Sequence, residues 1–468
     1  MPSLDRTDVA IVGGGIAGLS AAYALWNRGV DFRVLEAGSR FGGVIRSETL
    51  DGFLLEAGPD SLLAQKPEAL TLCRELGLAD RLIPTNPEKR AVYVLLRGRL
   101  HPLPEGMMLA VPTRIGAFLS SRLFSWSGKL RMGLDLVRPA RRQEGDESIA
   151  SFLRRRFGQQ CVERLGEPLL AGIHAGDPER LSILATFPRF AEMEKRSGSL
   201  IRAMWAAPKP TPRPGAPATA FYSLQGGLED LVAAIEGRLS AECLWRRAAV
   251  AALQRTDQGF RVDLADGRAL GARAVILAAP APKSAPLLRS LLPEVAESLA
   301  GIPFATTATV LLGYRRADIR HPLDGYGLVV PAGEGLRTSA ASFFSTKFPG
   351  RAPAGHALLR GFLGGVRDPR ILESSDAQIA DTFRREMTPV LGLSGEPVLT
   401  RVYRWPGATP QMEVGHGQRV AEIERRLLGL PGLFLTGAGI RGTGVPDCVA
   451  DAMTTAEAVA AFLGATRT

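Results

Sequence analysis

The chain has 468 residues, 46% of them hydrophobic and 22% charged, a balance typical of a globular protein with two or three domains. Its formal net charge is +10, but aromatic residues make up only 6% and no nucleic-acid-binding motif is present, which argues against a nucleic-acid partner. Most basic residues are scattered along the chain, as on a solvated surface. The rest of the positive charge is compatible with an acidic small-molecule substrate or with contact to anionic membrane headgroups.

The first predicted elements, over 9–26, are a strand, a glycine-rich turn and a helix. Gly13 allows the tight turn, Gly15 lets the backbone approach a pyrophosphate, and Gly18 lets helix and strand pack closely. The N-terminus of the helix offers free N–H groups and a partial positive charge to phosphates. Glu36 ends the next predicted strand, 18 residues after Gly18, close to the spacing of an acid that binds a ribose 2′-hydroxyl. The segment therefore predicts a bound dinucleotide.

A second glycine pair follows this acid and indicates which dinucleotide to expect. Arg40 can offer fixed hydrogen-bond donors to a phosphate, and Gly42 and Gly43 let the backbone come close to a flat cofactor. This second motif resembles that of a large flavoprotein group, the amine oxidases, carotenoid desaturases and porphyrinogen oxidases, whereas nicotinamide dehydrogenases usually lack it. The predicted cofactor is therefore FAD.

The segment 83–205 is predicted to be largely helical. Within it, residues 107–142 mix apolar side chains with arginines and a lysine, as in a basic amphipathic surface. The same pattern fits a helical layer over a buried pocket. A membrane-facing surface and a pocket cover are therefore both open interpretations of this segment.

The rest of the chain divides by composition. A proline-rich stretch over 206–218 cannot form helix or central strand and is predicted to be an exposed linker. Residues 219–298 contain a helix, a strand at Val250 and a buried strand before a proline. Residues 299–424 alternate apolar and polar in short runs, which predicts an antiparallel sheet. Residues 425–468 contain a strand, a glycine-rich turn and a final helix suited to the flavin end of FAD.

The predicted fold is therefore α/β plus α+β. Residues 1–82, 219–298 and 425–468 are expected to form a discontinuous, Rossmann-like FAD-binding domain of the amine-oxidase and porphyrinogen-oxidase type. Residues 299–424 are expected to form an antiparallel-sheet substrate-binding domain. Residues 83–205 are expected to form a helical domain over the substrate pocket.

The spacing of cysteines and histidines and the lengths of the apolar runs bear on metal binding and on cellular location. Cys73, Cys161, Cys243 and Cys448 form no CxxC pair or zinc spacing, and the five histidines show no metal-ligand spacing, so no metal site is predicted. The first predicted strand begins by Asp8, which leaves no room for a signal peptide, and no run of about 18 apolar residues is present. We expect a cytoplasmic protein, with peripheral attachment to the inner face of the cell membrane left open.

A narrower resemblance rests on short motifs spread over nearly the whole chain. They resemble, in order and spacing, the porphyrinogen oxidases of haem biosynthesis, most of all the Gram-positive bacterial type that oxidises coproporphyrinogen III. The motifs are EAGPDS (56–61), GIHAGD (172–177), LS (181–182), TFP (186–188), RW (404–405), PQ (410–411), GH (415–416) and VPDC (445–448).

Two positions depart from related patterns. His174 stands where family members usually have Tyr or Phe, so it either lines the pocket or only fills space. Gly437 and Ala438 stand where many other flavoproteins have Gly-Asp, which disfavours a generic amine oxidase and agrees with the porphyrinogen oxidases.

The resemblance implies a reaction. A porphyrinogen loses six electrons and six protons to become a porphyrin, in three rounds of hydride transfer to flavin, with dioxygen as acceptor and hydrogen peroxide as product. The cofactor performs the bond chemistry while the protein orients substrate and excludes water, so no catalytic side chain is predicted.

The resemblance also implies cofactor contacts. It assigns the first glycine turn to the pyrophosphate, Glu36 and Ala37 to the adenosine ribose, Val250 to adenine, and Trp405 to the side of the isoalloxazine. The expected FAD-binding residues are Gly13, Gly14, Gly15, Ile16, Ala17, Gly18, Glu36, Ala37, Arg40, Gly42, Gly43, Val44, Gly58, Pro59, Asp60, Ser61, Val250, Trp405, Val445, Pro446 and Asp447.

A flat, apolar substrate with carboxylate edges needs apolar walls and a cation. Lys66 follows the flavin-facing turn, where family members place a Lys or Arg for a propionate; a lysine exposed beside the helix from Pro67 is the alternative. The expected substrate-binding residues are Lys66, His174, Tyr326, Val329 and Phe362.

Several alternatives stay open at this point. Protoporphyrinogen IX competes with coproporphyrinogen III as substrate, although the net charge leans weakly towards the latter with its additional carboxylates. Another flavin amine oxidase, a carotenoid desaturase, or a non-catalytic prenyl-protein chaperone of the same fold are alternative functions. Oxygen or a quinone as acceptor, monomer or homodimer, and hand-off of the product to a ferrochelatase are likewise undecided.

Overall fold

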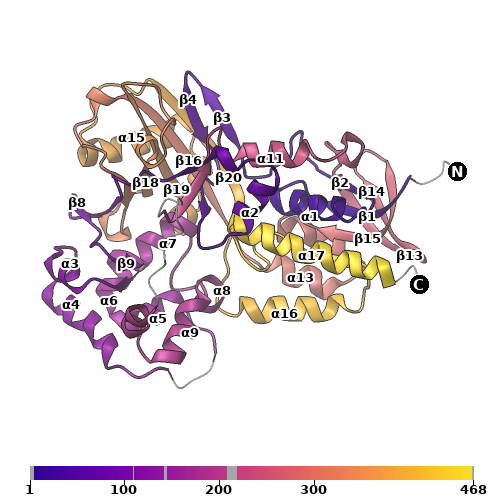
Figure 1. Ribbon diagram of the computed structural model, residues 1–468, viewed down its shortest axis with the longest axis horizontal. Coiled ribbons are helices and arrows are strands. Elements are labelled where there is room, and N and C mark those ends of the chain that lie inside the picture. The colour runs from indigo at the N-terminus through magenta and orange to yellow at the C-terminus, as the bar shows by residue number, and fades with distance from the viewer. Residues whose placement is uncertain (1–4, 109, 142–144, 208–218, 466–468) are drawn as a thin grey trace.

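The computed structural model describes residues 5–108, 110–141, 145–207 and 219–465. Two large sheets lie toward opposite ends of the long axis (Figure 1). The first sheet carries both ends of the chain at its side, and a helical region lies below the second sheet. The observed mixture of a Rossmann-like sheet, an antiparallel sheet and a helical part confirms the predicted fold class.

The first sheet is parallel at its centre, and its central strands are buried on both faces. Val9, Ala10 and Ile11 of β1 have no exposed surface, and such continuous apolar runs are typical of parallel strands. β1 pairs in parallel with β2 and β15, and β15 pairs in parallel with β21, so strands from all three segments of the expected cofactor domain share this sheet. Its strands are β1 (Asp5–Val12), β2 (Phe32–Leu35), β12 (Leu244–Trp245), β13 (Val250–Thr256), β14 (Gly259–Leu264), β15 (Ala269–Leu277) and β21 (Leu433–Leu435).

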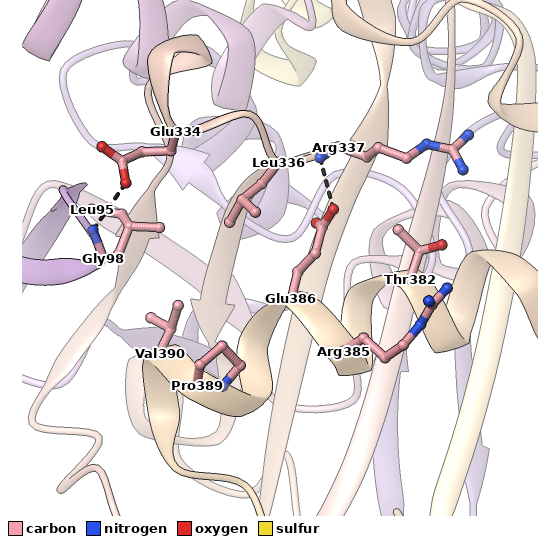
Figure 2. A pocket seen from close by; sticks show the side chains of 10 residues that line it. All are labelled: Leu95, Gly98, Glu334, Leu336, Arg337, Thr382, Arg385, Glu386, Pro389 and Val390. Atoms are coloured by element: carbon pink, nitrogen blue, oxygen red, sulfur yellow. Dashed lines mark hydrogen bonds between the residues drawn. The ribbon is translucent and has the colours of Figure 1, made fainter.

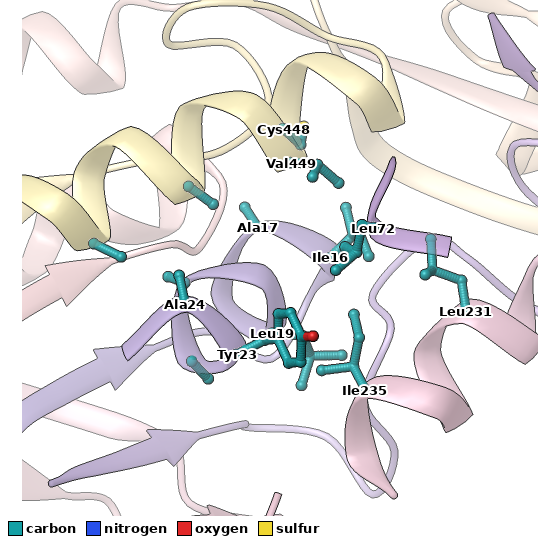
Figure 3. Close-up of a cluster of buried hydrophobic side chains, with 14 of the residues drawn as sticks. Ile16, Ala17, Leu19, Tyr23, Ala24, Leu72, Leu231, Ile235, Cys448 and Val449 are labelled. Atoms are coloured by element: carbon teal, nitrogen blue, oxygen red, sulfur yellow. The ribbon is translucent and has the colours of Figure 1, made fainter. Parts of the chain in front are cut away.

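Helices cover both faces of this sheet. Helix α1 is apolar on every side, and its residues from Ile16 to Leu25 are all buried. Figure 3 shows why: α1 lies between α17 and α11, with Leu72 of α2 alongside. On this face lie α1 (Ile16–Trp26), α2 (Glu68–Glu75), α11 (Glu229–Glu236) and α17 (Val445–Ala465); on the other lie α12 (Ala281–Leu288), α13 (Pro293–Ala300) and α16 (His416–Leu427).

The second sheet is antiparallel except where β17 and β7 pair in parallel. Helix α15 (Asp376–Leu391) covers one face and begins with a capping box between Ser375 and Gln378. The other face meets the cofactor-binding part and the helical region. In spatial order its strands are β20 (Leu399–Pro410), β16 (Phe304–Arg315), β19 (His356–Gly364), β18 (Thr338–Phe343), β17 (Gly325–Val329), β7 (Ala91–Leu96) and β8 (Arg99–Pro102).

Strands β7 and β8 correct the expectation that 83–205 is largely helical from its start. The run Ala-Val-Tyr-Val-Leu-Leu of β7 is rich in β-branched and aromatic residues, which favour strands, and it pairs with β17. The helical region begins only after the short hairpin of β9 (Met107–Met108) and β10 (Val111–Pro112). Its helices are α3 (Ile115–Ser120), α4 (Trp126–Gly133), α5 (Ile149–Phe157), α6 (Gln159–Cys161), α7 (Glu167–His174), α8 (Ile183–Thr186), α9 (Pro188–Ser197) and α10 (Leu200–Ala206).

The remaining short strands form two small sheets near the cofactor end. They are β3 (Ser47–Leu50) with β4 (Phe53–Glu56), and β11 (Phe221–Leu224) between β5 (Leu62–Leu63) and β6 (Leu82–Pro84). The predicted linker over 206–218 falls mostly outside the described residues, since 208–218 are not described. No helix in the described ranges is long and apolar enough to cross a bilayer.

One arginine of a basic run in the sequence is not a surface residue. Arg156, at the end of the Arg154-Arg155-Arg156 run in α5, has no exposed side-chain surface. Its Nε donates to Asp135 Oδ1 at 2.6 Å, and its Nη2 donates to the carbonyl of Gly198 at 2.7 Å. This arginine therefore holds helices of the helical region together.

Candidate active site

The first glycine turn forms an open cradle at the N-terminus of α1. Gly13 has φ +109°, and a Cβ at Gly18 would lie 1.9 Å from the Gly13 carbonyl oxygen, so side chains are excluded at both positions. A Cβ built at Gly15, which caps α1, would meet no atom within 4 Å. The N-terminus of the helix therefore faces open space at Gly15, as the binding of a diphosphate there would require.

The second glycine loop is attached directly to the first. The Gly42 N–H donates to the Gly14 carbonyl at 2.8 Å, and Gly15 and Gly42 form an isolated parallel bridge. Gly43 has φ +59°, and a Cβ there would lie 3.3 Å from Gly15 Cα. Two motifs separated in the sequence are thus one site in the structure.

Glu36 is fixed at the end of β2 by backbone donors. Its Oε2 accepts from the Gly14 N–H at 2.8 Å and its Oε1 accepts from the Gly38 N–H at 2.6 Å. Each oxygen keeps a second lone pair, which leaves acceptor capacity for ribose hydroxyls. Ala37 is exposed beside it, and the Ala248 N–H, two residues before Val250, donates to the Glu36 carbonyl at 2.8 Å.

Arg40 closes the second loop on itself. Its Nη1 donates to the carbonyls of Phe41 and Ile45, both at 2.9 Å, and its Nη2 donates to the Gly43 carbonyl at 2.5 Å. These contacts use three of the five guanidinium hydrogens, so two are left for the phosphate contact expected from the sequence. Burial lowers the pKa of Arg40.

The turn over 58–61 packs against the same loop. A Cβ at Gly58 would lie 1.9 Å from the Val44 carbonyl oxygen. The buried Asp60 carboxylate accepts from Lys347 Nζ at 3.0 Å and from Arg360 Nη1 at 2.9 Å, and Ser61 Oγ donates to it at 2.6 Å. Burial alone would raise the pKa of Asp60, but these two cations hold it well below its usual range.

Sequence reasoning missed both cations of Asp60. Lys347 belongs to α14 (Phe344–Lys347) and Arg360 to β19, and both lie far along the chain from the turn. The only local signal is an arginine inside the apolar strand Leu-Leu-Arg-Gly-Phe, where an unpaired charge would be costly.

The flavin-side residues from the other segments reach the same turn or the start of α17. Trp405 of β20 donates from Nε1 to the Ala57 carbonyl at 3.0 Å, so its indole lies against the turn. Asp447, in the first turn of α17 after Val445 and Pro446, accepts from the Gly444 N–H at 3.1 Å. Three segments of the chain therefore converge on one place.

At Gly437-Ala438, where many other flavoproteins have Gly-Asp, the carboxylate comes from elsewhere in the chain. Asp451 of α17 accepts from the Gly437 N–H at 3.2 Å and from Thr436 Oγ1 at 2.7 Å, and it also pairs with Arg441 at 2.5 Å. The carboxylate that holds this turn is therefore supplied by the following helix.

Lys66, Asp447 and His174 form a second polar cluster of the site. Lys66 Nζ lies 2.5 Å from Asp447 Oδ1, and their side chains are 47% and 21% exposed. Burial and the charge of Lys66 lower the pKa of His174 to about 4, although Asp447 acts in the opposite direction. The His174 ring meets Phe187 edge-on with 6.1 Å between centroids. A neutral imidazole thus lies near an ion pair.

The other expected substrate residues lie on the second sheet. Val329 of β17 faces the helical region, 3.8 Å from the position of a Cβ at Gly172. Phe362 of β19 packs into the same apolar cluster and pairs in register with Ala340. The Tyr326 hydroxyl donates to the Asn86 carbonyl at 2.9 Å and lies 3.0 Å from the Thr85 hydroxyl oxygen, which ties it to the loop after β6.

A cavity of about 540 Å³ lies elsewhere, between α15 and the 334–337 loop (Figure 2). Glu386 accepts from the Arg337 N–H at 2.9 Å and Glu334 accepts from the Gly98 N–H at 3.0 Å, so backbone donors occupy both carboxylates. The cavity opens on the α15 side of the second sheet, away from Phe362. It is therefore separate from the candidate active site.

A family described as flavin containing amine oxidoreductase matches residues 16–460. The chain belongs to this family. It is 36% identical over 457 residues to a coproporphyrinogen III oxidase of Bacillus subtilis, covering 95% of this chain and 96% of that one. It is also 36% identical to the coproporphyrinogen III oxidase of Propionibacterium freudenreichii (99% and 93% covered) and 30% identical to the chloroplastic protoporphyrinogen oxidase of Nicotiana tabacum (97% and 86% covered).

Solved structures agree with this membership. A protein of Exiguobacterium sp. 255-15, assigned as a protoporphyrinogen oxidase, superposes with a TM-score of 0.84 at 32% identity, covering 98% of this chain and 99% of that one. Putrescine oxidase, at 18% identity and a TM-score of 0.71 with 98% and 99% covered, shares the fold. The resemblance to porphyrinogen oxidases is confirmed, and the chain is an FAD-dependent oxidoreductase. The chaperone alternative receives no support from these relatives.

Proposed function

We propose that this chain oxidises coproporphyrinogen III to coproporphyrin III. The observation that carries the proposal is the ion pair of Lys66 with Asp447, one of the residues expected beside the flavin. The chain also resembles coproporphyrinogen III oxidases over nearly its full length. A cation beside the cofactor end and an apolar wall at Phe362 and Val329 suit a flat apolar substrate with carboxylate edges.

The side chains of the site bind and orient the substrate. Lys66 forms a charge-assisted hydrogen bond with one carboxylate of the substrate, which replaces Asp447 as its partner. Phe362 and Val329 supply the apolar surface against which the ring lies. His174 stays neutral at physiological pH because of its low pKa, so it adds no second positive charge beside Lys66.

The cofactor residues hold the acceptor in place. Bound FAD supplies the two-electron acceptor for each of three rounds of oxidation, and dioxygen regenerates it with release of hydrogen peroxide. Glu36 and the two glycine loops bind the nucleotide half, while the turn over 58–61 and Trp405 fix the flavin half. The protein thereby keeps the reacting carbon and the acceptor in one orientation and away from water.

The test is turnover of the FAD-loaded protein with coproporphyrinogen III and protoporphyrinogen IX separately, read by Soret absorbance, porphyrin fluorescence and peroxide. We expect faster oxidation of coproporphyrinogen III, one peroxide for each round, and a raised KM in Lys66→Gln. Lys283→Gln, an exposed lysine on α12, is the matched control. A preference for protoporphyrinogen IX overturns the substrate, and no turnover of either overturns the function.

We also propose peripheral contact with an anionic membrane through one face of the helical region. Trp126, Leu130, Leu134 and Val137 are 68%, 73%, 51% and 76% exposed. The first three are four residues apart in α4 and the turn after it, so they share a face. Exposed apolar patches with neighbouring basic residues are typical of surfaces that enter the interface of a bilayer, and Arg138 is exposed beside Val137.

Vesicle sedimentation tests this contact. We expect binding to phosphatidylglycerol vesicles, weaker binding to phosphatidylcholine, and loss of binding in Trp126→Ser/Leu130→Ser. Leu428→Ser, at an 80% exposed leucine after α16, is the matched control. Equal binding of all variants overturns the contact. Hand-off of product to a ferrochelatase stays a prediction.

A further inference from the structure

Arg360 contacts both the cofactor turn and the substrate wall. Its Nη2 donates to the Gly58 carbonyl and its Nη1 donates to Asp60 Oδ2 at 2.9 Å. The guanidinium carbon also lies 4.8 Å from the centre of the Phe362 ring. One side chain thus contacts a residue expected at the flavin and a residue expected at the substrate.

The backbone around Arg360 is rigid. In β19 it pairs in register with Leu311 of β16 and Ser342 of β18, so it lies in the interior of the second sheet. Arg360 and Phe362 are two residues apart on one strand and therefore share a face. The side chain of Arg360 is only 3% exposed. The position of the strand consequently determines the position of the Arg360 side chain against the turn.

The turn over 58–61 is also connected to the first glycine turn. Gly58 packs on the Val44 carbonyl, and the loop that contains Val44 is hydrogen-bonded to Gly14 through Gly42. Contacts therefore run without a break from Phe362 to the predicted pyrophosphate site.

We propose that Arg360 is a positioning residue, which fixes the flavin-side turn relative to the substrate wall and so sets the distance over which hydride passes. The inference rests on the proposed function. Neutralisation of Asp60 alone does not account for this arginine, because its guanidinium also contacts the Gly58 carbonyl and the Phe362 ring. Lys347 already supplies a positive charge to Asp60.

Lys347 provides the matched comparison. It donates to both Asp60 oxygens at 3.0 Å, so Lys347→Gln removes a charge from the same carboxylate as Arg360→Gln. Its ring contacts are Phe221 and Phe348, at 5.6 and 5.1 Å. An effect of charge alone therefore occurs in both variants, and an effect of positioning occurs only at Arg360.

The experiment measures kcat, KM and the visible circular dichroism of bound FAD in Arg360→Lys, Arg360→Gln and Lys347→Gln. We expect Arg360→Lys, which keeps the charge, to lower kcat by about tenfold to hundredfold and to change the flavin dichroism. Lys347→Gln should change the dichroism much less than Arg360→Gln does, because it removes a charge from Asp60 but no contact with the Gly58 carbonyl or with Phe362. We also expect Phe362→Leu to lower kcat by a smaller factor in the Arg360→Lys background than in the wild type.

Two results overturn the proposal: equal changes in dichroism for Lys347→Gln and Arg360→Gln, or independent effects of Phe362→Leu and Arg360→Lys. If Arg360→Gln does not fold, Arg360→Lys still gives the comparison. If the wild-type protein binds FAD but oxidises neither porphyrinogen, the proposed function fails while the dichroism still tests Arg360.

Discussion

Lys66 and Asp447 form an ion pair, with 2.5 Å between Nζ and Oδ1, although 381 residues separate them in the sequence. Asp447 is also bonded to the Gly444 N–H, so the pair joins the region before α2 to the start of α17. A substrate carboxylate that approaches Lys66 must compete with the carboxylate of Asp447.

Asp447→Asn is therefore expected to lower the KM for a porphyrinogen, whereas Lys66→Gln raises it. The gain should be at most about fivefold, because a half-exposed ion pair is worth up to about 1 kcal/mol. Steady-state kinetics with a parallel measurement of FAD content check this, since Asp447 is also an expected cofactor residue. An increase in KM for Asp447→Asn at full FAD content contradicts the competition.

Gly15→Ala is expected to separate cofactor binding from folding. A methyl group at Gly15 meets no protein atom within 4 Å, so the apoprotein should keep its Tm while FAD binding weakens. Gly13→Ala should lower the Tm of the apoprotein as well, because Gly13 has φ +109° and a Cβ there would lie 2.8 Å from the Ala279 nitrogen. Thermal unfolding and FAD titration distinguish the two variants. If Gly15→Ala binds FAD with the affinity of the wild type, the diphosphate of FAD does not lie at Gly15.

His174 should make folding stability depend on pH. Its pKa is lowered from 6.5 to about 4, so the unfolded chain binds more protons at this position between those values. The contribution of His174 is present above pH 6.5 and is lost as the pH falls toward 4. Urea unfolding of His174→Phe should show a smaller loss between pH 6.5 and 4 than the wild type. Parallel curves for the two proteins contradict the low pKa.

The buried pair of Arg156 and Asp135 should matter far more than an exposed pair on the same helix. Asp135→Ala removes the nearer of the two carboxylates that pair with the fully buried Arg156 and leaves only Glu194, at 3.3 Å, so it is expected to lower the free energy of unfolding by about 3 kcal/mol. Glu179→Ala removes a pair with Arg154 whose side chains are 51% and 42% exposed, and should cost less than about 1 kcal/mol. Denaturant unfolding checks both, and similar losses would mean that the buried pair is compensated.

The parts of the site that were predictable are those encoded locally. Gly13, Gly15 and Glu36 could be predicted to lie close together because turn, helix and acid follow one another within one βαβ unit, and the structure does bring Glu36 to the glycine turn. Lys347 and Arg360 were not, because their pairing with Asp60 depends on the position of the second sheet against the turn. β7 was missed although its valines and tyrosine favour a strand, because so short a run shows its structure clearly only once its pairing with β17 is known.

The position of α17 has a consequence for biosynthesis. Cys448 and Val449 of α17 cover one side of α1, the helix whose N-terminus forms the cradle (Figure 3). The ribosome makes α1 long before α17, so the apolar α1 stays without this cover until α17 has been synthesised. A nascent chain that lacks α17 therefore exposes an apolar helix to chaperones, and we expect the flavin to bind only after α17 has packed on α1.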